Sequence, residues 1–134
     1  MALSADLLRG YTDTIILNQL READNYGYEI NKRISELSQG MLELKEATLY
    51  TAFRRMENSG YIISYWGDEN MGARRRYYAI TPSGRDKLAQ DLMTWQETRK
   101  ALNALLDQRS GKPDFRDSAG NEIPMIHVEV ESHE

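Results

Sequence analysis

Apolar residues recur at helical spacing in three stretches of the first 58 residues. They predict helices over about residues 6–21, 28–38 and 45–58. A turn over 24–27 separates the first two, and Gly40 and Gly60 suit the ends of the second and third. In the second helix the stripe is formed by Ile30, Ile34 and Leu37.

The third predicted helix has one apolar and one polar side. Leu49, Phe53 and Met56 share the apolar side, helped by Ala52. The side chains that this arrangement turns towards solvent or a ligand are Thr48, Thr51, Arg54 and Arg55.

A short β-ribbon is expected after this helix. Residues 61–66 and 74–80 are rich in aromatic and β-branched residues and read as strands, with a flexible tip over 67–72. The second strand opens with Arg74, Arg75 and Arg76. Three adjacent cations repel one another, so an anionic partner explains them better than folding does.

The last predicted helix begins at Pro82, after the candidate N-cap residue Thr81, and runs to about Leu106. Roughly 25 residues would span about 37 Å, more than a small domain needs to cover itself. We therefore expect a dimerisation helix. Its apolar positions follow a heptad-like spacing, and those assigned to the dimer contact are Leu88, Leu92, Leu102 and Leu106.

These elements predict a mostly α chain with a small β wing, of the α+β class. The expected parts are a winged helix-turn-helix over 1–80, the dimerisation helix over 81–106 and an acidic tail over 107–134. Alternating apolar residues give the tail a candidate strand at 125–130, although its Gly, Pro and charge content equally favours disorder.

The net charge of −4 argues against a nucleic-acid partner only at first sight. Residues 107–134 hold seven acids and three bases, so the tail carries the whole excess, whereas the bases of the remainder bunch at 54–55 and 74–76. The chain has no cysteine, no apolar run of membrane-spanning length and no secretion signal, so a cytoplasmic protein without membrane contact is expected.

Several motifs resemble the PadR family of transcriptional regulators, in its short subgroup with one C-terminal helix. The matching stretches are residues 27–30 (Gly-Tyr-Glu-Ile), 48–50 with 54–57, 60–62, and 72–81 with 84–85. The resemblance covers about residues 5–106. Thr51 stands where the family often has proline, and Lys45 where a small capping residue is common.

The resemblance implies a homodimeric repressor that binds double-stranded DNA at a pseudo-palindromic operator, with the third helix in the major groove and the wing along the backbone or minor groove. Carried over to this chain, the DNA-binding residues are Thr48, Tyr50, Thr51, Arg54, Arg55, Arg74, Arg75 and Arg76. The tyrosine hydroxyl suits a phosphate, and an arginine suits a guanine.

Simpler interpretations stay open for these residues. Tyr50 fits a half-buried core position. Arg54 or Arg55 fits an ion pair with Glu57 or Glu46 on a solvated helix face, and the wing arginines fit a soluble edge strand. A winged-helix protein-interaction module without DNA binding is the alternative function.

The resemblance also implies an effector site between subunits, where aromatic compounds bind. A planar aromatic or cationic molecule stacking on Trp95 is the hypothesis, and ordinary core packing is the alternative. The neighbours assigned to Trp95 are Leu8, Asn18, Leu92 and Gln96.

No catalytic constellation appears in the sequence, so an enzyme is not expected. His127 and His133 are the only histidines, and we expect no metal site and no cofactor.

Overall fold

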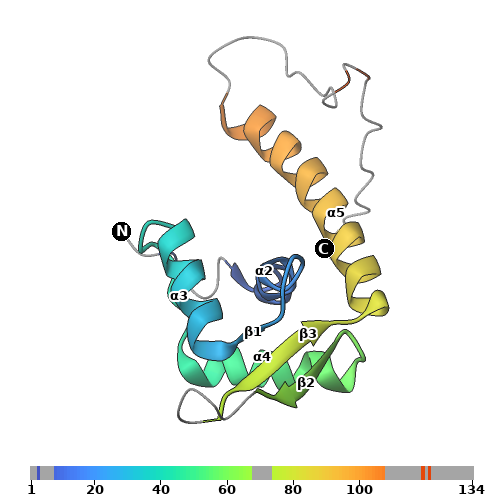
Figure 1. Cartoon of the computed structure of the whole chain (residues 1–134). Helices are drawn as coiled ribbons and strands as arrows, with labels where there is room; N and C mark the ends of the chain where they lie inside the picture. The colour runs from blue at the N-terminus through green and yellow to red at the C-terminus, as the bar shows by residue number, and fades with distance from the viewer. Residues whose placement is uncertain (1–2, 4–7, 68–73, 108–118, 120, 122–134) are drawn as a thin grey trace, which may run out of the picture. The chain divides into compact units, whose positions relative to one another are not determined.

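The computed structural model describes residues 3, 8–67, 74–107, 119 and 121. Helices dominate and a small antiparallel sheet accompanies them, which confirms the expected α+β class (Figure 1). The elements are α2 (Thr12–Gln19), β1 (Asn25–Tyr26), α3 (Gly27–Leu37), α4 (Glu46–Asn58), β2 (Ile62–Trp66), β3 (Arg76–Ile80) and α5 (Pro82–Leu106).

The chain divides into two compact units, Met1–Asp91 and Leu92–Glu134. The boundary falls within α5, so the first unit contains the sheet, the three shorter helices and the start of α5. The candidate strand at 125–130 lies outside the described residues.

The sheet has three strands in the order β1-β3-β2, with both pairings antiparallel. Residues 25–26 were expected to form a turn, and this expectation is wrong: Asn25 pairs with Tyr78, and Tyr26 pairs with Tyr77. A two-residue strand has no periodicity to detect, and only its partner β3 defines it. We call β2, β3 and the segment between them the wing.

The core of the first unit lies where α4 packs against α2, α3 and the sheet. The expected apolar side of α4 is confirmed, because Leu49, Ala52, Phe53 and Met56 are all buried. The ring of Phe53 stacks on Tyr78 of β3 with their centroids 3.9 Å apart, which joins α4 directly to the wing.

The first helix is shorter than the sequence pattern suggested. Gly10 adopts φ +94°, and α2 begins only at Thr12. A residue with positive φ interrupts a right-handed helix, so a single continuous helix over 6–21 is wrong. Ile16 and Leu17 supply the fully buried part of α2.

The α3 stripe also differs from expectation. Ile30 and Ile34 are buried, but Leu37 is 69% exposed. Leu37 is the last residue of α3, and the chain then turns through Gln39 and Gly40, both at positive φ. Leu37 therefore lies beyond the apolar core that Ile30 and Ile34 contact.

The start of α4 is fixed by a side chain of α3. Asn31 donates its Nδ2 hydrogen to the carbonyl oxygen of Leu44 (2.7 Å), and its Oδ1 accepts the Leu44 amide hydrogen (3.1 Å). Lys45, at the N-cap of α4, makes no capping hydrogen bond with its side chain. The pairing with Asn31 thus positions the helix entrance, as an N-cap side chain would elsewhere.

The start of α5 confirms the expected Thr81 cap and Pro82 entry. The Thr81 Oγ1 accepts the amide hydrogen of Gly84 (3.0 Å) and donates its own to the Gly60 carbonyl (2.6 Å). A Cβ on Gly84 would lie 2.1 Å from the carbonyl oxygen of Tyr61, so only glycine lets α5 approach the wing this closely.

Leu88 departs from its expected place in the dimer contact. It is 3% exposed within a single chain. Its side chain faces the core of its own unit because the first turns of α5 cover that unit, so it offers a second subunit almost no surface.

Candidate nucleic-acid interface

Tyr50, Thr51 and Arg54 are exposed on the side of α4 away from its core residues. The ring of Tyr50 packs edge-on against the ring of Phe53, with the two centroids 5.5 Å apart. Its hydroxyl passes over α3, where a Cβ on Gly27 would lie 2.7 Å from Oη. The glycine of the Gly-Tyr-Glu-Ile motif therefore makes room for the tyrosine of α4.

Within the described part of the chain, Arg54 forms no hydrogen bond or ion pair. Glu57, one of its two candidate partners, instead accepts a hydrogen bond from Ser64 of β2. Arg54 is therefore an exposed cation on the outward side of the helix, one turn from the contact between α4 and the wing.

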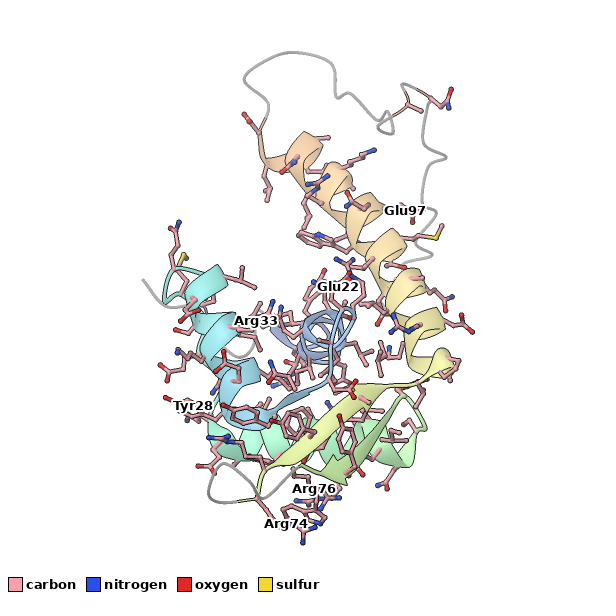
Figure 2. The ribbon with its side chains drawn as sticks, viewed as in Figure 1. Glu22, Tyr28, Arg33, Arg74, Arg76 and Glu97 are labelled. Atoms are coloured by element: carbon pink, nitrogen blue, oxygen red, sulfur yellow. The ribbon has the colours of Figure 1, made fainter. Side chains whose placement is uncertain are left out.

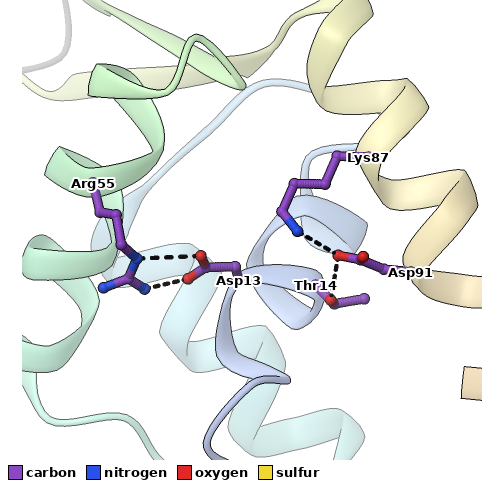
Figure 3. Close-up of polar contacts among 5 residues, drawn as sticks. All are labelled: Asp13, Thr14, Arg55, Lys87 and Asp91. Atoms are coloured by element: carbon purple, nitrogen blue, oxygen red, sulfur yellow. Dashed lines mark hydrogen bonds and ion pairs between the residues drawn. The ribbon is translucent and has the colours of Figure 1, made fainter. Parts of the chain in front are cut away.

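Arg55 is held by α2 rather than by its own helix. Its Nε–H donates to Asp13 Oδ2 (3.3 Å), and its Nη2–H donates to Asp13 Oδ1 (Figure 3). This hydrogen bonding raises the pKa of Arg55 above its ordinary value. Thr48 and Thr51 lie on the same flank, where they line a groove of about 850 Å³ with Arg55 and Asp13.

The neighbouring residue of α2 makes a similar contact to α5. Thr14 Oγ1 donates to Asp91 Oδ2 (2.9 Å), which also accepts a hydrogen bond from Lys87 (2.9 Å; Figure 3). Asp13 and Thr14 thus connect α4 and the start of α5 through a single helix.

The arginines of the wing are divided between its two faces. Arg74 and Arg76 lie over Trp66, with their guanidinium carbons 5.6 and 5.8 Å from the ring centroid. Arg75 lies over Tyr26 of β1 at 4.7 Å. Figure 2 shows Arg74 and Arg76 together at the outer end of the wing.

Arg76 also connects the wing to α4. Its Nε and Nη2 hydrogens are donated to Ser64 Oγ (3.0 and 2.8 Å), and Ser64 donates its own to Glu57 Oε2 (3.1 Å). The Arg76 Nη2 lies 3.8 Å from the same carboxylate oxygen. The basic end of the wing and the C-terminal turn of α4 therefore share one polar network.

A second groove, of about 420 Å³, lies between α3 and α4. Tyr28 and Lys32 of α3 and Glu46 and Tyr50 of α4 are among its lining residues. Tyr28 is exposed on the surface of α3 (Figure 2). The Gly-Tyr-Glu-Ile motif contributed to the family resemblance, but no site role was predicted for Tyr28 itself.

The residues assigned to an effector belong to both units. Leu8 and Asn18 are in the first, whereas Leu92, Trp95 and Gln96 are in the second. Asn18 Oδ1 is buried and accepts no hydrogen bond from the described residues. Trp95 is 37% exposed. Their grouping into one site stays a prediction.

Sequence reasoning missed three contributors to this region: Asp13, Ser64 and Trp66. Asp13 and Arg55 are 42 positions apart, so their pairing depends on the tertiary fold. The positions of Ser64 and Trp66 follow from strand alternation, which puts them on the face carrying Tyr78 and Arg76. Only the register observed in the structure places Trp66 beside Arg76.

None of the helices in the described residues combines the length and the apolar character that crossing a membrane requires.

Comparison with known proteins identifies the family. The model of the transcriptional regulator PadR-like family matches residues 16–90. A transcriptional regulator from Clostridium thermocellum has a similar structure, with 47% identity, a TM-score of 0.70, and coverage of 77% of this chain and 100% of that one. A PadR family regulator from Clostridium difficile R20291 has 41% identity, a TM-score of 0.66, and coverage of 72% and 99%.

A more distant similarity concerns a protein solved with DNA. The structure of Bacillus subtilis PadR in complex with operator DNA matches at 22% identity and a TM-score of 0.56, over 63% of this chain and 48% of that one. At this identity the match supports the shared fold. The family match extends from α2 into α5, and together with the similar structures it shows that this chain belongs to the PadR-like family of transcriptional regulators.

Proposed function

We propose that this protein regulates transcription by binding double-stranded DNA through α4 and the wing. The observation that carries the proposal is the network of Glu57, Ser64 and Arg76, which fixes the basic end of the wing beside the helix that exposes Arg54. A helix fits the major groove, and adjacent guanidinium groups suit the phosphate backbone beside it.

Each exposed group has a specific chemical task in this proposal. Arg54 suits the two acceptors of a guanine edge, a contact worth about 1–3 kcal/mol of discrimination. The Tyr50 hydroxyl and Arg74 suit phosphate oxygens, which position the protein without reading sequence. The Bacillus subtilis relative in complex with operator DNA supports this use of the fold.

The proposed assembly is a homodimer formed through α5. Met93, Leu102, Leu105 and Leu106 are exposed along the part of α5 that belongs to the second unit. Covering such side chains stabilises an assembly by about 25 cal/mol for each Å² of apolar surface. Two-fold symmetry then requires a pseudo-palindromic operator, with half-sites about 34–36 Å apart or a multiple of that spacing.

We further propose that the protein is a repressor released by a planar aromatic or cationic effector. Trp95 is partly exposed in the second unit and offers a flat surface for stacking. The effector releases DNA only if it prefers a dimer whose reading helices have a different spacing from that required by the operator.

A gel-shift on the stretch upstream of the protein's own gene tests DNA binding. Wild-type protein should shift this duplex, and a variant carrying both Arg74→Ala and Arg76→Ala should bind it much more weakly while keeping its circular dichroism spectrum. An unshifted duplex with folded wild-type protein, or equal binding by the variant, contradicts the proposed interface.

A further inference from the structure

We propose that Trp66 is a positioning residue, which holds the guanidinium groups of Arg74 and Arg76 where the wing contacts the DNA backbone. The inference rests on the proposed DNA-binding function and goes beyond it, because it assigns a role to a residue that need not touch DNA. It begins from the position of the indole, which is 55% exposed and lies close to both guanidinium groups.

The strand register explains this arrangement. Trp66 is the last residue of β2, and its pairing partner is Arg76, the first residue of β3. Arg74 is two residues before Arg76, and both guanidinium groups lie over the indole. The aromatic ring thus brings together two cations that would otherwise repel one another.

Arg76 is also held by residues of β2 and α4. Arg76 adds two hydrogen bonds to Ser64 and a nearby carboxylate on Glu57, so its guanidinium has a defined position before any ligand arrives. Arg74 is nearer the tip, and its guanidinium group also lies over the indole.

The energetic reason is the cost of ordering long side chains. An exposed arginine samples many rotamers, and binding a phosphate confines it to few of them. A group that already occupies the bound geometry avoids much of this cost and binds more tightly without a new contact. Bringing the guanidinium group of Arg74 close to that of Arg76 also costs free energy through charge repulsion, which the attraction of both groups to the indole offsets.

Fluorescence anisotropy on the full-length protein tests this role, with a labelled duplex that wild type shifts in the gel experiment. Trp66→Leu removes the aromatic face but keeps apolar bulk, and Trp66→Thr keeps strand propensity. Each should weaken binding by about 3- to 10-fold. Trp66→Phe retains an aromatic face and should stay within about 2-fold of wild type.

A double-mutant cycle distinguishes positioning from a direct or purely structural role. In a protein that already carries Arg74→Gln and Arg76→Gln, Trp66→Leu should cause no further loss, because there is nothing left to position. Thermal unfolding of each variant, followed by circular dichroism, verifies that the proteins compared are folded.

The possible failures are distinguishable. If wild type binds no duplex, the proposed function fails and this inference fails with it. If wild type binds and both Trp66→Leu and Trp66→Thr bind equally well, only the role of Trp66 is overturned. The same conclusion follows if Trp66→Phe is as weak as Trp66→Leu, or if the losses from Trp66→Leu and the two arginine substitutions simply add.

Discussion

The guanidinium group of Arg55 on α4 forms a two-point ion pair with the carboxylate of Asp13 on α2. Arg54, its neighbour in sequence, makes no such contact among the described residues. We therefore expect Arg55 to stabilise the fold and Arg54 to contact DNA.

Arg55→Gln is predicted to lower the free energy of unfolding by about 0.5–1 kcal/mol, because the pair is half exposed and screened by water. It should leave the salt dependence of DNA binding nearly unchanged. Urea unfolding and anisotropy titrations at several salt concentrations measure the two effects. Arg54→Gln is the matched control, with stability close to wild type and weaker DNA binding. A reversal of this pattern between the two variants would show that Arg55 is the DNA contact.

The wing arginines should also differ in their contributions. Arg75 lies over Tyr26 on the opposite face from Arg74 and Arg76. Each phosphate contact that is lost makes the plot of log affinity against log salt less steep by about 0.9. Arg74→Gln should reduce the steepness by about this amount, whereas Arg75→Gln should reduce it less. Equal slopes for the two variants would contradict the division between faces.

Gly84→Ala is predicted to destabilise the first unit by about 1–3 kcal/mol or more, because the added Cβ collides with the Tyr61 backbone. Ser83→Ala, at the exposed neighbouring position, is the control and should stay within about 0.5 kcal/mol of wild type. Urea denaturation of both variants checks this. Similar stability in the two would show that α5 can move away from the wing at little cost.

Alkaline pH should destabilise the protein through Tyr78. Burial raises the pKa of its phenol above the ordinary value of 10.0. The folded state therefore holds this proton more tightly than the unfolded state does. The corresponding stability is present below pH 10 and disappears as the pH rises through the folded pKa.

Tyr78→Phe removes this ionisation and should reduce the stability lost between pH 8 and pH 11. Urea unfolding at both pH values measures that loss, with Tyr28→Phe as an exposed control. If wild type and Tyr78→Phe lose the same stability, another group governs the alkaline transition.

The dimer is predicted to depend on the end of α5. Leu102→Asp combined with Leu106→Asp places charges on exposed apolar positions, and should shift the mass measured by light scattering from dimer to monomer. Leu37→Asp, also at an exposed leucine but on α3, is the control and should stay dimeric. A monomeric wild type would remove the basis for a two-fold operator.

The extents of α3, α4 and α5 and the presence of the wing were predictable because each is encoded locally. The apolar side of α4, the Thr81 cap and the Pro82 entry all have signals within a few residues. Gly10 and Leu37 show the limit of this local signal. The apolar stripe continues through Gly10, where positive φ interrupts the helix, and it includes Leu37, which is exposed at the end of α3.

The missing features arise from contacts between distant parts of the chain. Nothing near residues 25–26 indicates a strand until β3 lies beside them, and Asp13 looks like any first-turn acid until α4 brings Arg55 close. The same reasoning explains Leu88, whose heptad spacing cannot reveal which of two apolar surfaces it will meet.

The salt dependence of duplex binding by the wild-type protein tests the central claim most directly. If α4 and the wing contact the phosphate backbone, log affinity should fall linearly with log salt. The affinity itself should fall about 10³- to 10⁵-fold between 50 and 200 mM salt for 6–10 contacts, and Arg74→Gln should make this dependence less steep. Affinity that does not change with salt, or no binding to any duplex at 50 mM, would contradict the account.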